Sequence, residues 1–145
     1  MKKLLSALFA MVLATGCATT TQPINEMELL AQALDISPTK NISLWNIPSR
    51  GAIADAASIS TNGGGAADQL SAVMQQIGQK GAGTLILTSK NPKLPLAHLE
   101  GALENLDSVP AELFLIYAGN ESNYASIKQT FDAYNIAHGF INLGK

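Results

Sequence analysis

Cysteine and positive charge are both scarce in this chain of 145 residues. The one cysteine, Cys17, leaves no partner for an intramolecular disulfide and no cysteine cluster for a metal ion. Nine Lys and Arg residues, scattered among 11 Asp and Glu residues, are too few to neutralise a row of phosphates, which argues against a nucleic-acid partner. The sequence therefore predicts a protein stabilised by packing alone, with no metal and no cofactor.

The apolar segment at the N-terminus is also short. Leu4–Ala14 is an uncharged run of 11 residues, whereas a membrane-spanning helix needs about 20. Lys2 and Lys3 precede this run and small residues follow it, which is the arrangement of a signal peptide. We therefore expect residues 1–16 to be a signal peptide and not a transmembrane helix.

The tetrad Ala14-Thr15-Gly16-Cys17 resembles the lipobox of bacterial lipoproteins, with Ala14 at a position where the family prefers Leu. The resemblance implies that the Cys17 thiol receives a diacylglyceryl group, that cleavage occurs just before Cys17, and that the new N-terminus takes a fatty acid such as palmitate. In this family, a residue other than Asp after the cysteine, here Ala18, directs the protein to the outer membrane of a Gram-negative host. In another host the protein would stay at the cell membrane. The alternative is an ordinary cleaved signal peptide with an incidental cysteine.

Cleavage before Cys17 would leave 129 residues, which is the size of one domain. Loss of Lys2 and Lys3 would leave seven basic residues against 11 acidic ones, a net charge of −4. The small and polar residues after Cys17 predict a flexible tether over residues 17–24, followed by a single domain over residues 25–145.

Helical and strand patterns alternate along this domain. Apolar spacing predicts helices over residues 25–34, 66–79 and 96–106, and a last helix that begins at Asn120 or Ser122 and stops at Asn135. Apolar runs predict strands over residues 40–47, 84–88, 112–117 and 138–143. The unbroken run at 112–117 predicts a strand at the centre of the sheet. Residues 49–60 fit either a helix or a strand, and a strand near Ala57–Ser60 is preferred.

Three helix-then-strand units joined by short loops imply right-handed crossovers. We therefore predict an α/β fold, a three-layer sandwich with a mainly parallel sheet of about four or five strands, flavodoxin-like or Rossmann-like in topology only.

Ligands of open parallel sheets bind beyond the carboxyl ends of the strands, near helix N-termini. The predicted loops at this edge are rich in Ser, Thr, Asn and Gly, and their candidate ligand-binding residues are Ser60, Thr61, Asn62, Gly63, Gly64, Gly65, Ser89, Lys90, Asn120 and Glu121. An anion held by the amides of the triple glycine is the most specific form of this hypothesis. A flexible connector is the alternative, since neither GxGxxG nor GK[ST] is present.

Catalytic motifs are missing, because the sequence holds no GxSxG and no HExxH. His98 is expected at the surface of a helix, and His138 is expected to be a structural residue of an edge strand. No catalytic residue is therefore predicted, although a Ser-His-Asp set could assemble from distant residues.

Two sets of apolar residues are candidates for contact with a protein partner. Trp45, Tyr117, Tyr124 and Tyr134 form either an exposed aromatic patch or, as is more common, parts of the core. The first helix places Met27, Leu30, Ala31 and Leu34 at helical spacing, and this face either packs on its own domain or docks on a partner.

The sequence supports two hypotheses of function. In the first, the chain is a lipid-anchored, non-catalytic accessory or assembly module of an envelope machine such as a secretion, pilus or conjugation apparatus. In the second, it is a small-ligand-binding or hydrolytic domain that uses the strand-end loops. A deep pocket in which His138, Glu121 or Lys90 converge would favour the second hypothesis, and a flat apolar surface patch would favour the first.

Overall fold

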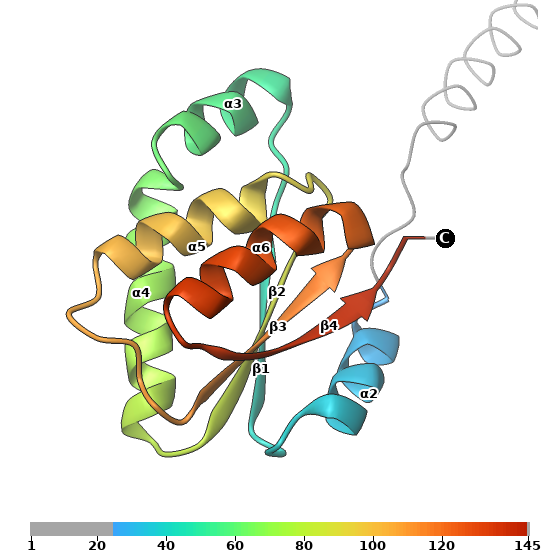
Figure 1. Cartoon of the computed structure of the whole chain (residues 1–145). Helices are drawn as coiled ribbons and strands as arrows, with labels where there is room; N and C mark the ends of the chain where they lie inside the picture. Colours follow the sequence, from blue (N-terminus) through green and yellow to red (C-terminus); the bar gives the residue numbers. More distant parts are fainter. Residues whose placement is uncertain (1–24, 145) are drawn as a thin grey trace, which may run out of the picture.

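A computed structural model of the chain describes residues 25–144 (Figure 1). The predicted signal peptide, lipobox and tether, residues 1–24, lie outside the described residues, as does Lys145. Four parallel strands pair in the order β1-β2-β3-β4, with bounds β1 Ile42–Ile47, β2 Gly83–Ser89, β3 Leu113–Gly119 and β4 Ala137–Asn142. Five helices complete the described part of the chain: α2 Glu26–Ile36, α3 Ala52–Ser60, α4 Gly64–Gln79, α5 Leu94–Glu104 and α6 Glu121–Ala133.

The sheet separates two apolar layers, to which successive strand residues contribute in turn. On one face Leu85 and Leu87 of β2 pack in the cluster formed by α4, α5 and α6, and on the other face Ile86 packs with Leu29 of α2. This alternation follows from the two-residue period of a strand. Because the strands pair in sequential order, right-handed crossovers place the connecting helices on one face. The predicted three-layer α/β sandwich with a parallel, Rossmann-like sheet is confirmed.

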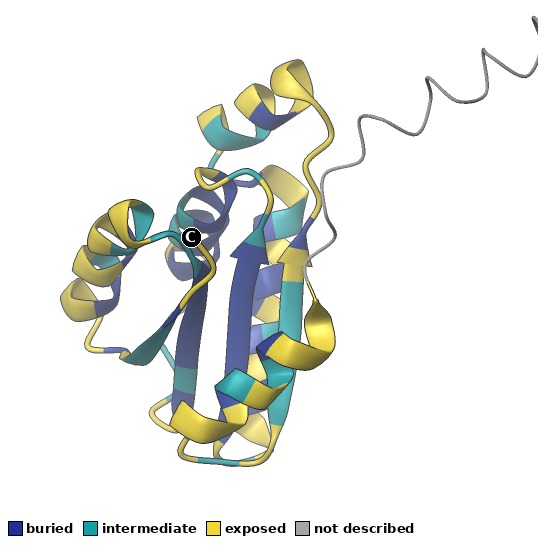
Figure 2. Cartoon of the chain, turned by 90° about the vertical axis from the view of Figure 1, so that its right-hand side faces the viewer, coloured by how far each residue is buried: buried dark blue, intermediate teal, exposed yellow. Residues whose placement is uncertain are grey.

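The two inner strands, β2 and β3, are covered on both faces, as the dark-blue strands in Figure 2 show. Leu115 and Ile116 of β3 point to opposite layers and are both fully buried. The prediction that the unbroken apolar run lies at the centre of the sheet is therefore confirmed. β1 and β4 are the edge strands.

Polar residues cap α2 and α6, and of the two predicted starts of the last helix, Asn120 and Ser122, the structure uses Asn120. The Asn25 side chain accepts a hydrogen bond from the Glu28 N–H and caps α2, and the Asn120 side chain accepts one from the Asn123 N–H and caps α6. Asn135, with a φ of 54°, takes the left-handed conformation after α6. The caps thus fix where both helices begin.

The preferred strand near Ala57–Ser60 is wrong, because these residues belong to helix α3. β1 has already ended at Ile47, and Gly51, with a φ of 100°, turns the chain into α3. Alanine is the strongest helix former, and four alanines in a nine-residue segment outweigh the strand preference of two isoleucines.

The predicted apolar face of α2 is also wrong in part. Leu29 and Ala33 are the residues that α2 buries against the sheet, with Leu30 partly buried, whereas Met27 is 78% exposed and Leu34 is also exposed. The helix therefore packs on its own domain, through a face that is rotated from the predicted one. Within residues 25–144, none of the helices has both the length and the apolar character that crossing a membrane requires.

Candidate functional site

The candidate ligand-binding residues do not form one site. Ser89 ends β2 and Asn120 follows β3, so these residues and their neighbours Lys90 and Glu121 lie at the predicted carboxyl edge of the sheet. The segment from Ser60 to Gly65 does not follow a strand, because α3 separates it from β1. The prediction that this segment is a strand-end loop is wrong, because the strand preferred at Ala57–Ser60 is part of helix α3.

The triple glycine is divided between a turn and a helix. Gly63, with a φ of 84°, is the N-cap of α4, and Gly64 and Gly65 already belong to the helix. The expectation of a loop through Gly65 is therefore wrong by two residues. Among residues 25–144 no side chain caps this end of α4, and its first turn consists of glycine and alanine only.

A cavity of about 410 Å³ lies at the carboxyl end of β1, between α3, the first turn of α4 and the first turns of α5. Its polar lining comes from Arg50, Asp55, Ser58, Thr61 and His98, together with the glycines of α4. Thr61, Gly63 and Gly65 are the predicted site residues that it includes; Ser89, Lys90, Asn120 and Glu121 are not among its lining residues.

Asp55 fixes α3 to the two neighbouring loops. Its carboxylate accepts hydrogen bonds from the Ser49 hydroxyl at 2.5 Å, the Arg50 N–H at 2.8 Å and the Asn91 side-chain amide at 2.9 Å. The side-chain bonds from Ser49 and Asn91, then the backbone bond, lower the pKa of Asp55 below its ordinary value, so the group is ionised at neutral pH. Asp55 is 5% exposed, and all three donors are uncharged. Its role here is to hold loops and helix together.

His98 and Ser58 form the second polar contact between α3 and the body of the domain. The His98 Nε2 lies 3.0 Å from the Ser58 hydroxyl oxygen, and the imidazole is 4% exposed. The prediction of a surface histidine is wrong, because α5 is apolar on almost every side and is buried with its histidine. Burial lowers the pKa of His98, which favours the neutral ring. Its Nδ1 is buried and has no hydrogen-bond partner among residues 25–144.

This pair has two of the three parts of a nucleophilic site. A neutral imidazole beside a hydroxyl can accept its proton, as in serine hydrolases. Within the described residues the third part, a carboxylate on the other ring nitrogen, is missing, because the Asp55 carboxylate is bonded to Ser49, Arg50 and Asn91 and not to His98. The arrangement therefore suits binding of a polar group better than activation of Ser58.

Close helix packing supports this cavity. A Cβ on Gly101 of α5 would lie 1.9 Å from the Asn62 carbonyl oxygen, and a Cβ on Gly63 would lie 3.0 Å from His98. Only glycine at these two positions lets the α3–α4 turn lie directly on α5. The almost wholly apolar sequence of α5 was the available indication that His98 would be buried. No comparable pattern joins Asp55 to Asn91 or Ser58 to His98, because these partners are 36 and 40 positions apart.

The other predicted polar residues at this edge are used in turns and caps. The Ser89 hydroxyl donates to the Ile47 carbonyl at 2.7 Å, which ties β2 to the end of β1. The Asn120 side chain accepts from Asn123 and from the Ser122 hydroxyl. Both residues therefore have a structural use in the described part of the chain.

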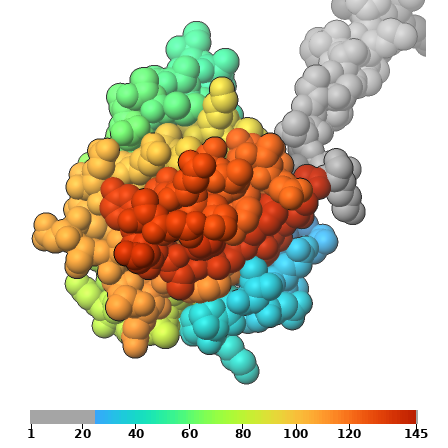
Figure 3. Space-filling model, viewed as in Figure 1, coloured from blue at the N-terminus to red at the C-terminus, as the bar shows by residue number. Residues whose placement is uncertain are grey.

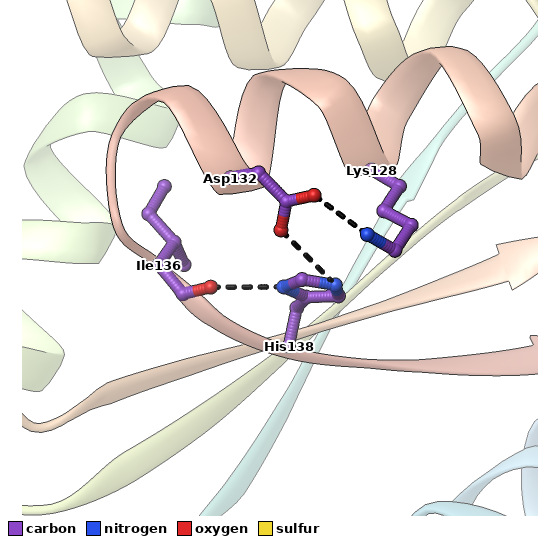
Figure 4. A network of polar contacts seen from close by, with 4 residues as sticks. All are labelled: Lys128, Asp132, Ile136 and His138. Carbon is purple, nitrogen blue, oxygen red and sulfur yellow. Dashed lines mark hydrogen bonds and ion pairs between the residues drawn. The ribbon is translucent and has the colours of Figure 1, made fainter.

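His138 lies on the edge strand β4, as predicted (Figure 4). It stands near the amino end of β4, whereas Glu121 follows the carboxyl end of β3, so the two lie at opposite edges of the sheet. The His138 Nδ1 lies 2.9 Å from the Ile136 carbonyl, and its Nε2 lies 3.9 Å from Asp132, which also pairs with Lys128 at 2.6 Å. The hydrogen bond to Asp132 raises the pKa of Lys128, and the same bond lowers the pKa of Asp132. The convergence of His138, Glu121 and Lys90 that would favour an enzyme does not occur.

Most of the four aromatic residues belong to the core. Tyr117 is buried, Trp45 packs against the same cluster, and Tyr124 stacks on Phe140 with ring centroids 4.2 Å apart. Of the four, only Tyr134 is largely exposed, at 45%. An aromatic docking patch made of all four is therefore not formed.

Among the described residues 25–144, no three His, Cys, Asp or Glu side chains are grouped so that they could hold a metal ion. Comparison of the chain with protein-family models, with curated proteins and with solved structures finds no match.

Proposed function

We propose that this chain is an outer-membrane-anchored periplasmic lipoprotein, or a cell-membrane lipoprotein in a host without an outer membrane. Its α/β domain would serve as a non-catalytic accessory or assembly module of an envelope machine of the secretion, pilus or conjugation type. The resemblance of Ala14-Thr15-Gly16-Cys17 to a lipobox supports the anchor. Each buried CH₂ of a lipid chain contributes roughly 0.8 kcal/mol, so one chain holds a protein only marginally and two or more hold it firmly.

The observation that supports the assembly role is the open edge of β1. This strand pairs with β2 on one side only, and within the described residues no strand pairs with its other side. Its six residues include no charged residue and no proline, the devices by which natural edge strands prevent pairing with other chains. An extended segment of a partner could therefore add to the sheet beside β1 through main-chain hydrogen bonds.

Photocrosslinking in intact cells tests this role. A photoreactive phenylalanine analogue replaces Asn46, which is exposed on β1. We expect one discrete protein adduct, and we expect Ser43→Lys in the same chain to abolish it because a charged side chain on the edge opposes strand addition. Gln76→Lys is the matched control, since it makes the same charge change on the exposed surface of α4. Adducts that persist unchanged in the Ser43→Lys variant would contradict the role of the β1 edge.

The anchor is tested separately by Cys17→Ser. We expect this variant to lose lipid attachment and to leave the detergent-extracted membrane fraction. If Cys17→Ser is still processed and present there in unchanged amount, the proposed location is wrong.

A second candidate function is a small-ligand-binding or hydrolytic domain, favoured specifically by the contact between Ser58 and His98 in the cavity at the end of β1. A fluorophosphonate probe tests the hydrolytic form, because it labels activated serines. Labelling of Ser58 that Ser58→Ala and His98→Gln both remove would support an enzyme. Labelling no stronger than that of the Ser122 hydroxyl, which is exposed on α6, would count against one.

A further inference from the structure

The surface of α3 is unlike that of the other helices. Asp55 is its only charged residue, and this side chain points into the protein. Ile53 is 89% exposed, the highest exposure of any large apolar side chain in the described residues. The remaining exposed surface consists of small or uncharged residues: Ala52, Ala54, Ala56, Ala57 and Ser60. Helices of soluble proteins normally expose polar and charged side chains to water. α3 exposes no charged side chain and therefore lacks the usual surface of such a helix.

α3 also projects from the rest of the molecule. Figures 1 and 2 show it beyond the end of the sheet toward which the strands run, and Figure 3 shows its side chains standing apart from the body of the domain. Its position is fixed by the hydrogen bonds of Asp55 and by the contact between Ser58 and His98. These contacts hold its polar side inward and leave Ile53 directed away from the domain.

The chain that leads from Cys17 reaches the domain at the same end. The end of α2 lies at the amino edge of the sheet, because Ile36 packs against Gly139 near the start of β4 and the Ser37 hydroxyl lies 2.6 Å from that of Thr84 near the start of β2. The first residue of α2, Glu26, therefore lies nearer the carboxyl edge. α3 follows β1 and lies at that carboxyl edge. The eight peptide bonds that join Cys17 to Asn25 can span at most about 28 Å. A lipid on Cys17 would therefore keep this end of the domain close to the bilayer.

Two cations lie close to α3. Arg50 precedes the helix by two residues and lines the cavity at the end of β1, and Lys93 lines a second surface cavity together with Ile59 of α3. Long basic side chains beside an apolar surface suit a membrane interface, because their charged ends reach the lipid phosphates while their stems lie among apolar groups.

We propose that α3 docks on the phospholipid surface of the membrane that holds the anchor, with Ile53 inserted at the level of the headgroups. This inference rests on the proposed lipid anchor. A helix of nine residues with one large apolar side chain would bind a membrane weakly by itself. The anchor changes this, because a tethered second contact forms at a high effective concentration and needs little affinity of its own.

Fluorescence quenching in vesicles tests the proposal with the full lipidated protein. The vesicles contain phosphatidylethanolamine and a minor share of phosphatidylglycerol, with brominated acyl chains as the quencher. An NBD fluorophore is attached at Ile53→Cys; the Cys17 sulfur, already a thioether, does not react. Gln76→Cys is the matched control, since it is exposed near the end of α4 and therefore at the opposite edge of the sheet. We expect several-fold stronger quenching at position 53 than at position 76.

A second variant shows whether Ile53 is the inserting group. With the fluorophore at Ala56→Cys, quenching should fall to the level of position 76 when Ile53→Glu is added. Ile53 is almost fully exposed, so this change should leave the fold intact.

Each other outcome overturns the proposal. Equal, weak quenching at positions 53 and 76 in protein that sediments with the vesicles would show that the anchor works and α3 does not dock. Protein that fails to sediment would remove the anchor and the proposal together. Shielding of position 53 by envelope protein, without quenching by lipid, would assign α3 to a protein partner.

Discussion

α3 and α6 distribute charge in opposite ways. α6 buries Ile127 and Phe131 and keeps Lys128 and Asp132 in solvent, where they pair at 2.6 Å. α3 buries its one charged residue, Asp55, and exposes Ile53. α6 is thus held by apolar packing, whereas α3 is held by a small polar network. The comparison predicts that α6 is destabilised most by loss of a buried apolar side chain and α3 by loss of a buried hydrogen-bond acceptor.

The largest effect should come from the apolar side of α6. Phe131 is fully buried and packs in the main core cluster with Tyr117, so Phe131→Ala removes an aromatic ring and leaves a cavity. We expect a loss of about 3–5 kcal/mol in the free energy of unfolding, measured by urea denaturation. Tyr134→Ala, an exposed aromatic at the end of the same helix, is the control and should change this free energy by at most about 0.5 kcal/mol. Similar losses in both variants would show that α6 is not held by its buried face.

The equivalent substitution in α3 is Asp55→Ala. It leaves the donors of Ser49, Arg50 and Asn91 without their acceptor. We expect the amides of α3 to lose protection in hydrogen exchange while those of α4 and α6 keep theirs. Asp132→Ala, which removes an exposed carboxylate from α6, should leave protection unchanged in both helices. Loss of protection throughout the domain would show that Asp55 stabilises more than α3.

The stabilisation that Asp55 gives to α3 should depend on pH in one direction. The pKa of Asp55 is lower in the folded protein than its ordinary value of 3.8. The stabilisation is therefore complete above pH 3.8 and is lost as the pH falls through the folded value.

The same contrast explains what the sequence could and could not predict. In β3 and α6, apolar residues are buried and polar residues cap or face water, so spacing alone located the central strand and narrowed the start of α6 to Asn120 or Ser122. In α3 that rule is reversed, and Ile53 and Ile59 favoured a strand that does not exist. The cavity was missed with it, because its contacts join residues 36 and 40 positions apart. The pattern of neighbouring residues in the sequence cannot predict contacts between such distant pairs. The predicted site at the triple glycine did include Gly63 and Gly65, which line the cavity.

A smaller effect is expected from His98, the second polar contact of α3. Burial lowers the pKa of His98 below its ordinary value of 6.5, so the unfolded chain binds the proton more readily than the folded one. The free energy of unfolding should be insensitive to this group above pH 6.5 and should decrease as the pH falls below 6.5. His98→Gln should remove that decrease in urea denaturation, whereas His138→Gln should retain it. The opposite pattern would assign the pH dependence to β4.

The smallest effect on stability should come from the most exposed apolar residue of α3. Ile53 is 89% exposed, so Ile53→Ser removes almost no packing, and the free energy of unfolding should change by no more than about 0.5 kcal/mol. Val73→Ser is the comparison, because Val73 on α4 is partly buried against the core and its removal should cost more. A loss for Ile53→Ser as large as that for Val73→Ser would mean that Ile53 packs within its own domain. In that case α3 would have no exposed apolar side chain with which to contact a membrane. The exposure of Ile53 beside a buried Asp55 would then need another explanation.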